Sequence, residues 1–334
     1  MPGERIAPGG TDSAAAARPR AGAPEAVERR SRASSIGALV HHRLRRPSLE
    51  GRTLACLREA IYFRESNGPL LWLALPDHPP HRRAILAEFD PSRAAVGSSV
   101  RASGGCLLVD GLPGIAISET ICWSPPTIGR TRLLDWDALA DRLPVFAADV
   151  AQASDRRGFG HLIGRPLGDP PEANSDDPDL RTWEAIFPPA GDLLRAGAAD
   201  GLAGVWEAAS RLIGLGPGLT PAGDDFVGGL LFAIEQVARA HPGRVHRDHA
   251  RRRAFLEHVR TATNQISYAI LCDLAHGHGP EPMHSLLQSL LDGEEPGRAL
   301  SAARAITKIG HTSGWDLLAG MLSGLALLVG RDGR

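Results

Sequence analysis

The sequence is organised around the stretch Gly214-Leu215-Gly216-Pro217-Gly218-Leu219-Thr220-Pro221-Ala222-Gly223-Asp224-Asp225-Phe226-Val227-Gly228. Within it, Thr220, Asp224 and Gly228 follow one another at a spacing of four. The same trio recurs as Thr312, Asp316 and Gly320 in Ile309-Gly310-His311-Thr312-Ser313-Gly314-Trp315-Asp316-Leu317-Leu318-Ala319-Gly320. This spacing places a hydroxyl, a carboxylate and a bare backbone position along one face of a helix. Both stretches therefore predict the start of a helix, and we expect the two helix ends to form one shared ligand site.

The first stretch combines features that favour an anion with features that oppose one. Thr220 and Pro221 predict the start of a helix over 221–240. Upstream, Gly216 and Gly218 let backbone amides approach an anion, to which a helix N-terminus adds partial positive charge. Asp224 and Asp225 would repel that anion unless a cation, an amino group or a proton lies between them. The stretch thus indicates a ligand with both an anion and an NH2 group, an Mg2+ ion held by the two aspartates, or helix capping alone.

Two further stretches contribute candidate site residues. Ser313 and Asp316 have the spacing of a capping box, which would explain both without a ligand. His311 and Thr312 lie outside that box, and a histidine in such a loop can act as an acid, a base or an oxyanion donor. In 261–268, polar side chains interrupt an apolar helix face, so they either bond one another or line the pocket. The remaining candidate ligand-binding residues are Gly223, Asn264, Ser267 and Gly314.

Apolar patterning predicts two parts of different structure. Short apolar or alternating runs separated by turn signals extend from about 35 to 124 and predict an antiparallel sheet or small barrel. Helical spacing follows and predicts helices over 133–150, 190–213, 221–240, 248–276, 282–291, 297–308 and 313–329. The expected class is α+β, with a disordered tail at 1–35, a β-rich domain at 36–130 and a helical domain at 131–330 that carries the site.

Composition excludes several kinds of partner. The chain has 334 residues with 37 basic and 38 acidic side chains, so no overall charge draws it to nucleic acid or to a membrane surface. The apolar run from Leu317 to Val329 is too short to span a bilayer. The four cysteines lack CxxC spacing, which predicts a protein of the reducing cytoplasm without a disulfide framework or a structural zinc site. Common nucleotide-binding, zinc-protease and serine-hydrolase motifs are absent from the sequence.

The two glycine-containing stretches resemble the bacterial AllH-like family, which is associated with oxamate carbamoyltransferase. The resemblance extends over about 36–330, and Ala222 stands where many relatives have serine, which removes a nucleophilic hydroxyl from that position. It implies a carbamoyltransferase subunit of purine and allantoin breakdown that converts oxalurate and phosphate into oxamate and carbamoyl phosphate. It also implies hetero-oligomers with other carbamoyltransferase subunits.

The implied substrates agree with the residues, since each combines an anion with an amide NH2. On this hypothesis Gly216, Gly218 and Thr220 bind the anion, Asp224 binds the carbamoyl nitrogen or a metal, and His311 with Thr312 polarises the carbonyl. Asp225 and Asp316 orient their neighbours. Two alternatives remain open: an accessory subunit that binds the metabolite without converting it, and a metal-dependent amidohydrolase that uses Asp224, Asp225 and His311.

Overall fold

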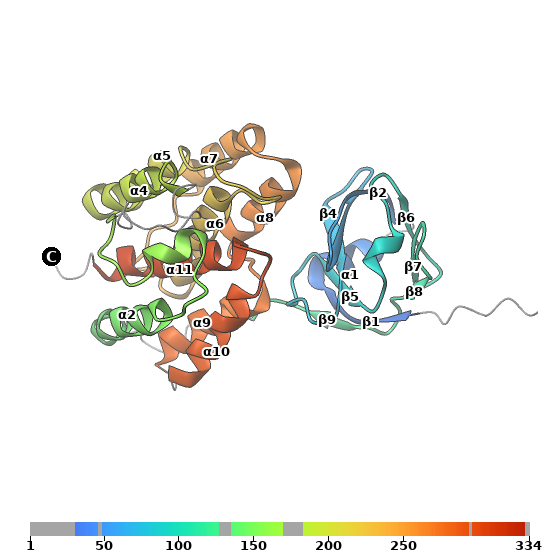
Figure 1. Cartoon of the computed structure of the whole chain (residues 1–334), viewed down its shortest axis with the longest axis horizontal. Helices are drawn as coiled ribbons and strands as arrows, with labels where there is room; N and C mark the ends of the chain where they lie inside the picture. The colour runs from blue at the N-terminus through green and yellow to red at the C-terminus, as the bar shows by residue number, and fades with distance from the viewer. Residues whose placement is uncertain (1–30, 46–48, 127–134, 170–182, 294–295, 331–334) are drawn as a thin grey trace, which may run out of the picture.

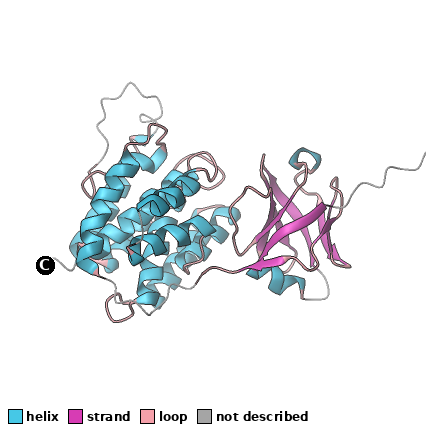
Figure 2. Ribbon diagram, turned by 90° about the horizontal axis from the view of Figure 1, so that it is seen from below, coloured by secondary structure: helices cyan, strands magenta, loops and turns pink. Residues whose placement is uncertain are grey.

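The computed structural model describes residues 31–45, 49–126, 135–169, 183–293 and 296–330, which form a β-barrel followed by a helical region (Figures 1 and 2). The predicted α+β class is therefore confirmed. Within the described residues, no helix is long and apolar enough to cross a membrane. Residues 1–30 and the predicted domain boundary at 130 lie outside the described residues.

Eight strands close into a barrel, and a ninth pairs with the first. The order β5-β4-β3-β2-β6-β7-β8-β1 closes through pairing of β1 with β5. Strand β9 pairs with the C-terminal part of β1, whereas β8 pairs with its beginning. The sheet is mixed and not purely antiparallel, because β1 runs parallel to β8 and β9, and β4 runs parallel to β5. The strands are β1 (Ser31–Gly37), β2 (Leu49–Cys56), β3 (Ala60–Glu65), β4 (Leu70–Ala74), β5 (Ala84–Ala87), β6 (Ser99–Ser103), β7 (Cys106–Val109), β8 (Ile115–Ala116) and β9 (Ile121–Trp123).

The last five residues of the predicted tail belong to a strand. Ser31 to Ser35 belong to β1, where Ala33 and Ile36 point into the barrel core. Two short helices, α1 (Ala38–Leu44) and η1 (Pro91–Arg93), complete this part. The alternation of small polar and apolar residues in β1 is too weak to predict a strand, so its place is decided by pairing with β5 and β8.

The helical predictions agree with the structure except at two breaks. The predicted helix 190–213 is interrupted at Gly201, whose φ of 66° no helix accommodates, and 248–276 is interrupted at Asn264, which caps a new helix. The helices and the short η2 are α2 (Trp136–Ala151), η2 (Gly158–Leu162), α4 (Phe187–Asp200), α5 (Leu202–Ala209), α6 (Ala222–Ala240), α7 (His249–Ala262), α8 (Gln265–Ala275), α9 (Glu281–Asp292), α10 (Pro296–Thr307) and α11 (Ser313–Val329).

Helices α6 and α11 form the centre of the helical region and touch backbone to backbone. A Cβ added at Gly320 would lie 2.0 Å from the Phe226 carbonyl oxygen, and one at Gly229 would lie 2.1 Å from that of Leu317. Gly228 lies against the side chain of Leu274 in α8. The glycines of the two trios therefore allow close helix packing, which accounts for the bare backbone positions without a ligand.

Replacing Gly320 by alanine is expected to lower the free energy of unfolding by about 1–3 kcal/mol or more, because α6 and α11 must separate. Gly297→Ala is the matched control, since this exposed glycine of α10 has no atom within 4 Å of its added Cβ. That change is expected to stabilise by about 0.5–1 kcal/mol, because alanine has the higher helix propensity. Urea denaturation of the two variants measures both effects, and equal shifts would contradict the close packing.

The outer face of β3, β4 and β5 contacts α8. In Figure 1, α8 lies on the side of the helical region that faces the barrel. Trp72 is buried there, and Ile270 of α8 packs against the same cluster. Arg83 forms a bidentate ion pair with Asp273 of α8, with nitrogen–oxygen distances of 2.6 and 2.8 Å. This face brings β3 toward the N-terminal end of α6.

Candidate functional site

The N-termini of α6 and α11 converge, as the shared trio predicts. The hydroxyl oxygens of Thr220 and Ser313 lie 3.0 Å apart although 93 positions separate the residues. Neither motif caps its helix through a side-chain hydrogen bond, although Asp224, Asp225 and Asp316 do lie in the first turns. Pro221 and Thr312 occupy the N-cap positions without a side-chain cap bond, and Asp316 accepts a hydrogen bond from another segment. The hydroxyls and carboxylates are therefore not used to cap their own helices.

Asp224 holds three segments together. Its Oδ1 accepts a hydrogen bond from the amide of Gly214 at 2.7 Å, and its Oδ2 accepts from the hydroxyls of Thr263 and Ser267, each at 2.5 Å. The carboxylate is almost fully buried. Because three donors already occupy its oxygens, Asp224 fixes the glycine-rich loop and the start of α8, which explains the buried Ser267 predicted in the third stretch.

Asp225 is the carboxylate that lies beneath the pair of hydroxyls. Its Oδ2 accepts a hydrogen bond from Thr220 at 2.8 Å, and the hydroxyl of Ser313 interacts with it as well. Burial raises the pKa of Asp225 to about 8, with a further contribution from Asp224, although the two hydroxyls act in the opposite direction. A carboxyl group with this pKa exchanges its proton near neutral pH, which suits acid–base chemistry.

Asp316 provides a third buried carboxylate at the same helix ends. Its Oδ1 accepts a hydrogen bond from the amide of Phe159 in η2 at 2.7 Å, whereas its Oδ2 has no hydrogen-bond partner among the described residues. Burial and the charge of Asp225 raise the pKa of Asp316 well above its ordinary value, although hydrogen bonds from the Phe159 amide and the Thr312 hydroxyl act in the opposite direction. Asp225 and Asp316 thus form a buried acidic pair, which hydrogen bonds from the N–H groups of a ligand would stabilise.

The exposed rim of the site is cationic. His311 is exposed, and both of its ring nitrogens lie within 2.8 Å of Nη1 of Arg157, the residue directly before η2. Thr312 and Ser313 are half-buried between this rim and the acidic pair. An anion at Arg157 and His311 would therefore lie next to groups that accept N–H donors.

The glycine-rich loop lies beside the hydroxyl pair. Gly216 and Gly218 have φ angles of 101° and 109°, which other residues rarely adopt. Their amides make no hydrogen bond to the described part of the chain, so they remain able to bind an anion. Asn264 holds the loop, because its Nδ2 donates to the carbonyl of Leu219 at 2.7 Å while its Oδ1 caps α8.

Two predicted ligand-binding glycines serve packing instead. A Cβ at Gly223 or at Gly314 would lie 2.0 Å from the carbonyl oxygen of Leu212 or of Ile306, respectively. Backbone occupies the space beside each α-carbon, so no ligand contacts them there. Metal binding has weak geometric support as well, since the oxygens of Asp224 are already occupied and the described residues contain no group of three metal-type ligands.

Sequence patterns did not indicate three residues of this region. Tyr62 comes from β3 of the barrel, and burial together with the charge of Asp225 raises its pKa to about 12. No local pattern links a strand residue to a helix end 163 positions later. Only a weak sequence feature indicates Arg157 as a site residue: it is a cation directly before the turn Gly158-Phe159-Gly160. Thr263 directly precedes the predicted Asn264 and lies in the stretch already singled out.

Comparison with known proteins supports the resemblance. Residues 212–325 match the family model described as oxamate carbamoyltransferase subunit AllH. The match contains both trios and runs from near the beginning of the α5–α6 connection into α11. It is narrower than the predicted extent of 36–330 and leaves out the barrel. No solved structure matches the chain. Over residues 212–325 the chain therefore has the sequence pattern of the AllH family, a subunit of oxamate carbamoyltransferase, as its two motifs predict.

Proposed function

We propose that this chain is a carbamoyltransferase subunit whose converging helix ends bind a small metabolite that carries both an anionic group and N–H donors. The observation that carries this assignment is the position of Asp225 and Asp316. Both are buried beneath the half-buried Thr220 and Ser313, and no cation of the described residues pairs with either carboxyl group. Buried carboxyl groups in this setting favour a ligand whose N–H groups hydrogen-bond to them.

The anionic part of the metabolite would bind at the rim. Arg157 supplies a permanent positive charge, and the amides of Gly216 and Gly218 with the two helix N-termini supply partial positive charge. The N–H groups would then point toward Asp225. Oxalurate and carbamoyl phosphate both have this combination of groups, which agrees with the family description.

Carbamoyl transfer at this site would use these groups as follows. A phosphate oxygen attacks the ureido carbonyl carbon of oxalurate, the bond from that carbon to the oxamate nitrogen breaks, and the nitrogen takes up a proton. Arg157 and His311 would stabilise the oxyanion formed on the carbonyl. Asp225 would supply the proton to the leaving nitrogen, since a carboxyl with a pKa of about 8 is protonated at neutral pH.

Calorimetric titration with oxalurate, carbamoyl phosphate and phosphate tests the assignment. Arg157→Ala and Asp225→Asn are each expected to weaken binding by about tenfold or more. The first removes the charge that binds the anion, and the second replaces a carboxyl oxygen that accepts N–H donors by an amide NH2 group. The control is Arg165→Ala, an exposed arginine that follows η2. Affinities of both site variants equal to that of the control would contradict the assignment.

The description of the family as a subunit favours one second candidate, an accessory chain that binds the metabolite without converting it. Turnover assays separate the two. If the chain is catalytic, Asp225→Asn must lower kcat, whether turnover of oxalurate is measured with the isolated chain or with the complex that it forms with its partner subunits. Unchanged kcat of the complex with weakened regulation would identify the accessory role.

A further inference from the structure

Side chains of β3 alternate between the barrel core and the helical region. Phe63 is fully buried in the core, whereas Tyr62 packs against the same outer cluster as Ile270 of α8. The ring centroids of Tyr62 and Trp72 lie 5.5 Å apart, so a neighbour in β4 holds the tyrosine in place. Arg64, two positions later, shares this outer face. The barrel therefore presents a tyrosine and an arginine to the helical region.

Hydrogen bonds connect this face of β3 to the segment that carries the hydroxyl pair. Nη1 of Arg64 donates to Oε1 of Gln265 at 2.7 Å, at the start of α8. The preceding residue, Asn264, donates from Nδ2 to the carbonyl of Leu219 at 2.7 Å. Leu219 directly precedes Thr220, whose hydroxyl donates to Asp225. The outer face of β3 therefore lies next to the glycine-rich loop and the N-terminal end of α6.

Helix α11 also directs its N-terminal end toward the barrel. In Figure 1, its C-terminal end lies on the side of the helical region away from the barrel. The N-terminal end carries Ser313, which meets Thr220 at the site. The barrel thus lies on the side to which both the hydroxyl pair and the start of α8 are turned.

The hydroxyl of Tyr62 is available to a ligand. It makes no hydrogen bond to the described part of the chain, and the side chain is half-buried. Burial and the charge of Asp225 raise the pKa of Tyr62 to about 12, so the hydroxyl keeps its proton at neutral pH. Asp225 therefore acts on the phenol through its charge, without a hydrogen bond between them. A ligand group that bonds to both must accept from Tyr62 and donate to Asp225.

We propose that the barrel contributes Tyr62 to the site as a substrate-binding residue, whose hydroxyl donates a hydrogen bond to the carbonyl oxygen of the ligand's carbamoyl group. This role rests on the proposed function of the site. A carbamoyl group carries an acceptor oxygen and an NH2 donor on one carbon, so it can accept from Tyr62 while it donates to Asp225. Tyr62 would accordingly select carbamoyl compounds among the small anions that Arg157 attracts.

Calorimetric titration of the full chain with oxalurate and with oxalate tests this role, because oxalate has carboxylates but no N–H group. Tyr62→Phe removes the hydroxyl and keeps the ring beside Trp72, so we expect it to fold. The variant should bind oxalurate about five- to tenfold more weakly, the effect of one neutral hydrogen bond, and oxalate as the wild type does.

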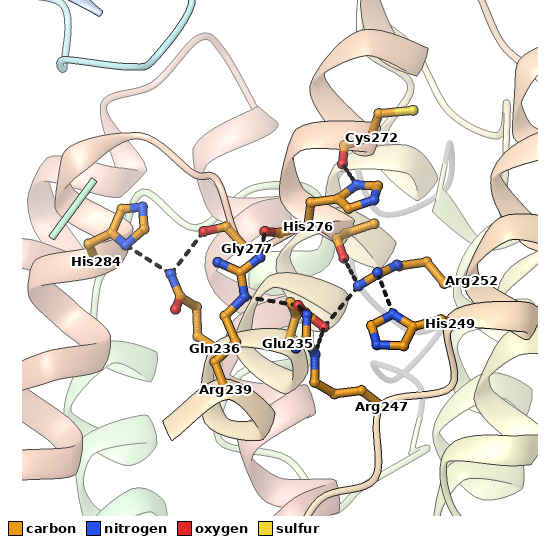
Figure 3. A network of polar contacts seen from close by, with 11 residues as sticks. Glu235, Gln236, Arg239, Arg247, His249, Arg252, Cys272, His276, Gly277 and His284 are labelled. Carbon is orange, nitrogen blue, oxygen red and sulfur yellow. Dashed lines mark hydrogen bonds and ion pairs between the residues drawn. The ribbon is translucent and has the colours of Figure 1, made fainter. Parts of the chain in front are cut away.

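The matched control is Tyr268→Phe, which changes the second of the two tyrosines in the chain. The hydroxyl of Tyr268 interacts with the side chain of Cys272 in the same helix. The carbonyl of Cys272 in turn bonds to the ring of His276, in the polar network at the C-terminal end of α8 (Figure 3). Tyr268→Phe should therefore bind oxalurate as the wild type does.

Fluorine NMR separates contact with the ligand from structural support. Protein that contains 3-fluorotyrosine has two resonances, and Tyr62→Phe identifies the one that belongs to Tyr62. Saturating oxalurate should shift the Tyr62 resonance further than oxalate does and leave that of Tyr268 in place.

The possible results distinguish this role from the proposed function itself. Oxalurate binding that Arg157→Ala weakens and Tyr62→Phe leaves unchanged would overturn the role of Tyr62 and retain the proposed function. Equal losses of oxalurate and oxalate affinity in Tyr62→Phe would also overturn it, because the hydroxyl would then not read the carbamoyl group. Absence of oxalurate binding by the wild type would overturn both.

Discussion

Asp225→Asn is expected to make the folded protein more stable than the wild type at pH 8 and nearly equal to it near pH 4. Burial raises the folded-state pKa of Asp225 to about 8, whereas the ordinary value is 3.8. The folded state therefore binds one more proton than the unfolded state between these values. The contribution of Asp225 to the free energy of unfolding is therefore fully present below the ordinary pKa and is lost as the pH rises toward 8.

The expected slope from this one group is about 1.4 kcal/mol for each pH unit, which adds up to roughly 6 kcal/mol between the two pKa values. Asparagine stays neutral and keeps an acceptor for Thr220, so the variant loses this part of the slope. Asp316 retains its own part, because burial raises its pKa as well. Urea denaturation between pH 4.5 and 8, within that window, measures the slope.

The matched control is Asp141→Asn, which changes an exposed aspartate of α2. If the wild type and Asp225→Asn showed parallel stability curves, Asp225 would be ionised in the folded protein and could not deliver a proton. A variant that is more stable but binds oxalurate more weakly would instead show that Asp225 is kept for function at the expense of stability.

Asp273→Ala is expected to lower the free energy of unfolding by about 3–5 kcal/mol, the range for breaking one partner of a buried ion pair. The reason is that Arg83 would remain buried between the barrel and α8, with 11% of its side chain exposed and without its carboxylate. Burial alone would raise the pKa of Asp273, but the hydrogen bonds and charge of Arg83 hold it below the ordinary value. The ion pair accordingly stabilises the folded protein at neutral pH, and this contribution is lost in acid.

An exposed ion pair with similar distances provides the control. Asp192 and Arg195 lie 2.7 Å apart on α4 with about half of each side chain exposed, so Asp192→Ala should cost about 1 kcal/mol or less. Replacing Arg83 by methionine and Asp273 by leucine together should recover most of the loss, because no buried charge is left without a partner. Denaturation by urea compares all three variants. If Asp273→Ala and Asp192→Ala lowered the free energy of unfolding equally, the ion pair between the barrel and α8 would not be buried in solution.

Local spacing in the sequence predicts the helices and the convergence of the two motifs. Apolar residues at helical spacing predict α6 over 221–240 and α11 over 313–329, close to their observed bounds, because one turn of helix places every third or fourth residue on one face. The repeated trio predicts that the N-termini of the two helices converge, and the hydroxyl oxygens of Thr220 and Ser313 do lie 3.0 Å apart. Ser313 is the neighbour of the trio residue Thr312, so the spacing did not indicate which hydroxyl makes the contact.

The different roles of Asp224 and Asp225 depend on segments that are distant in the chain. Asp224 and Asp225 are neighbours with the same side chain. Asp224 accepts hydrogen bonds from Gly214, Thr263 and Ser267, whereas Asp225 interacts with the hydroxyls of Thr220 and Ser313. The barrel was likewise closed by pairing of β1 with β5, strands more than 40 positions apart, and Tyr62 was brought to Asp225 by docking on α8. Local spacing determines which face of a helix a residue occupies, but its solvation, its partners and hence its proton affinity depend on segments distant in the chain.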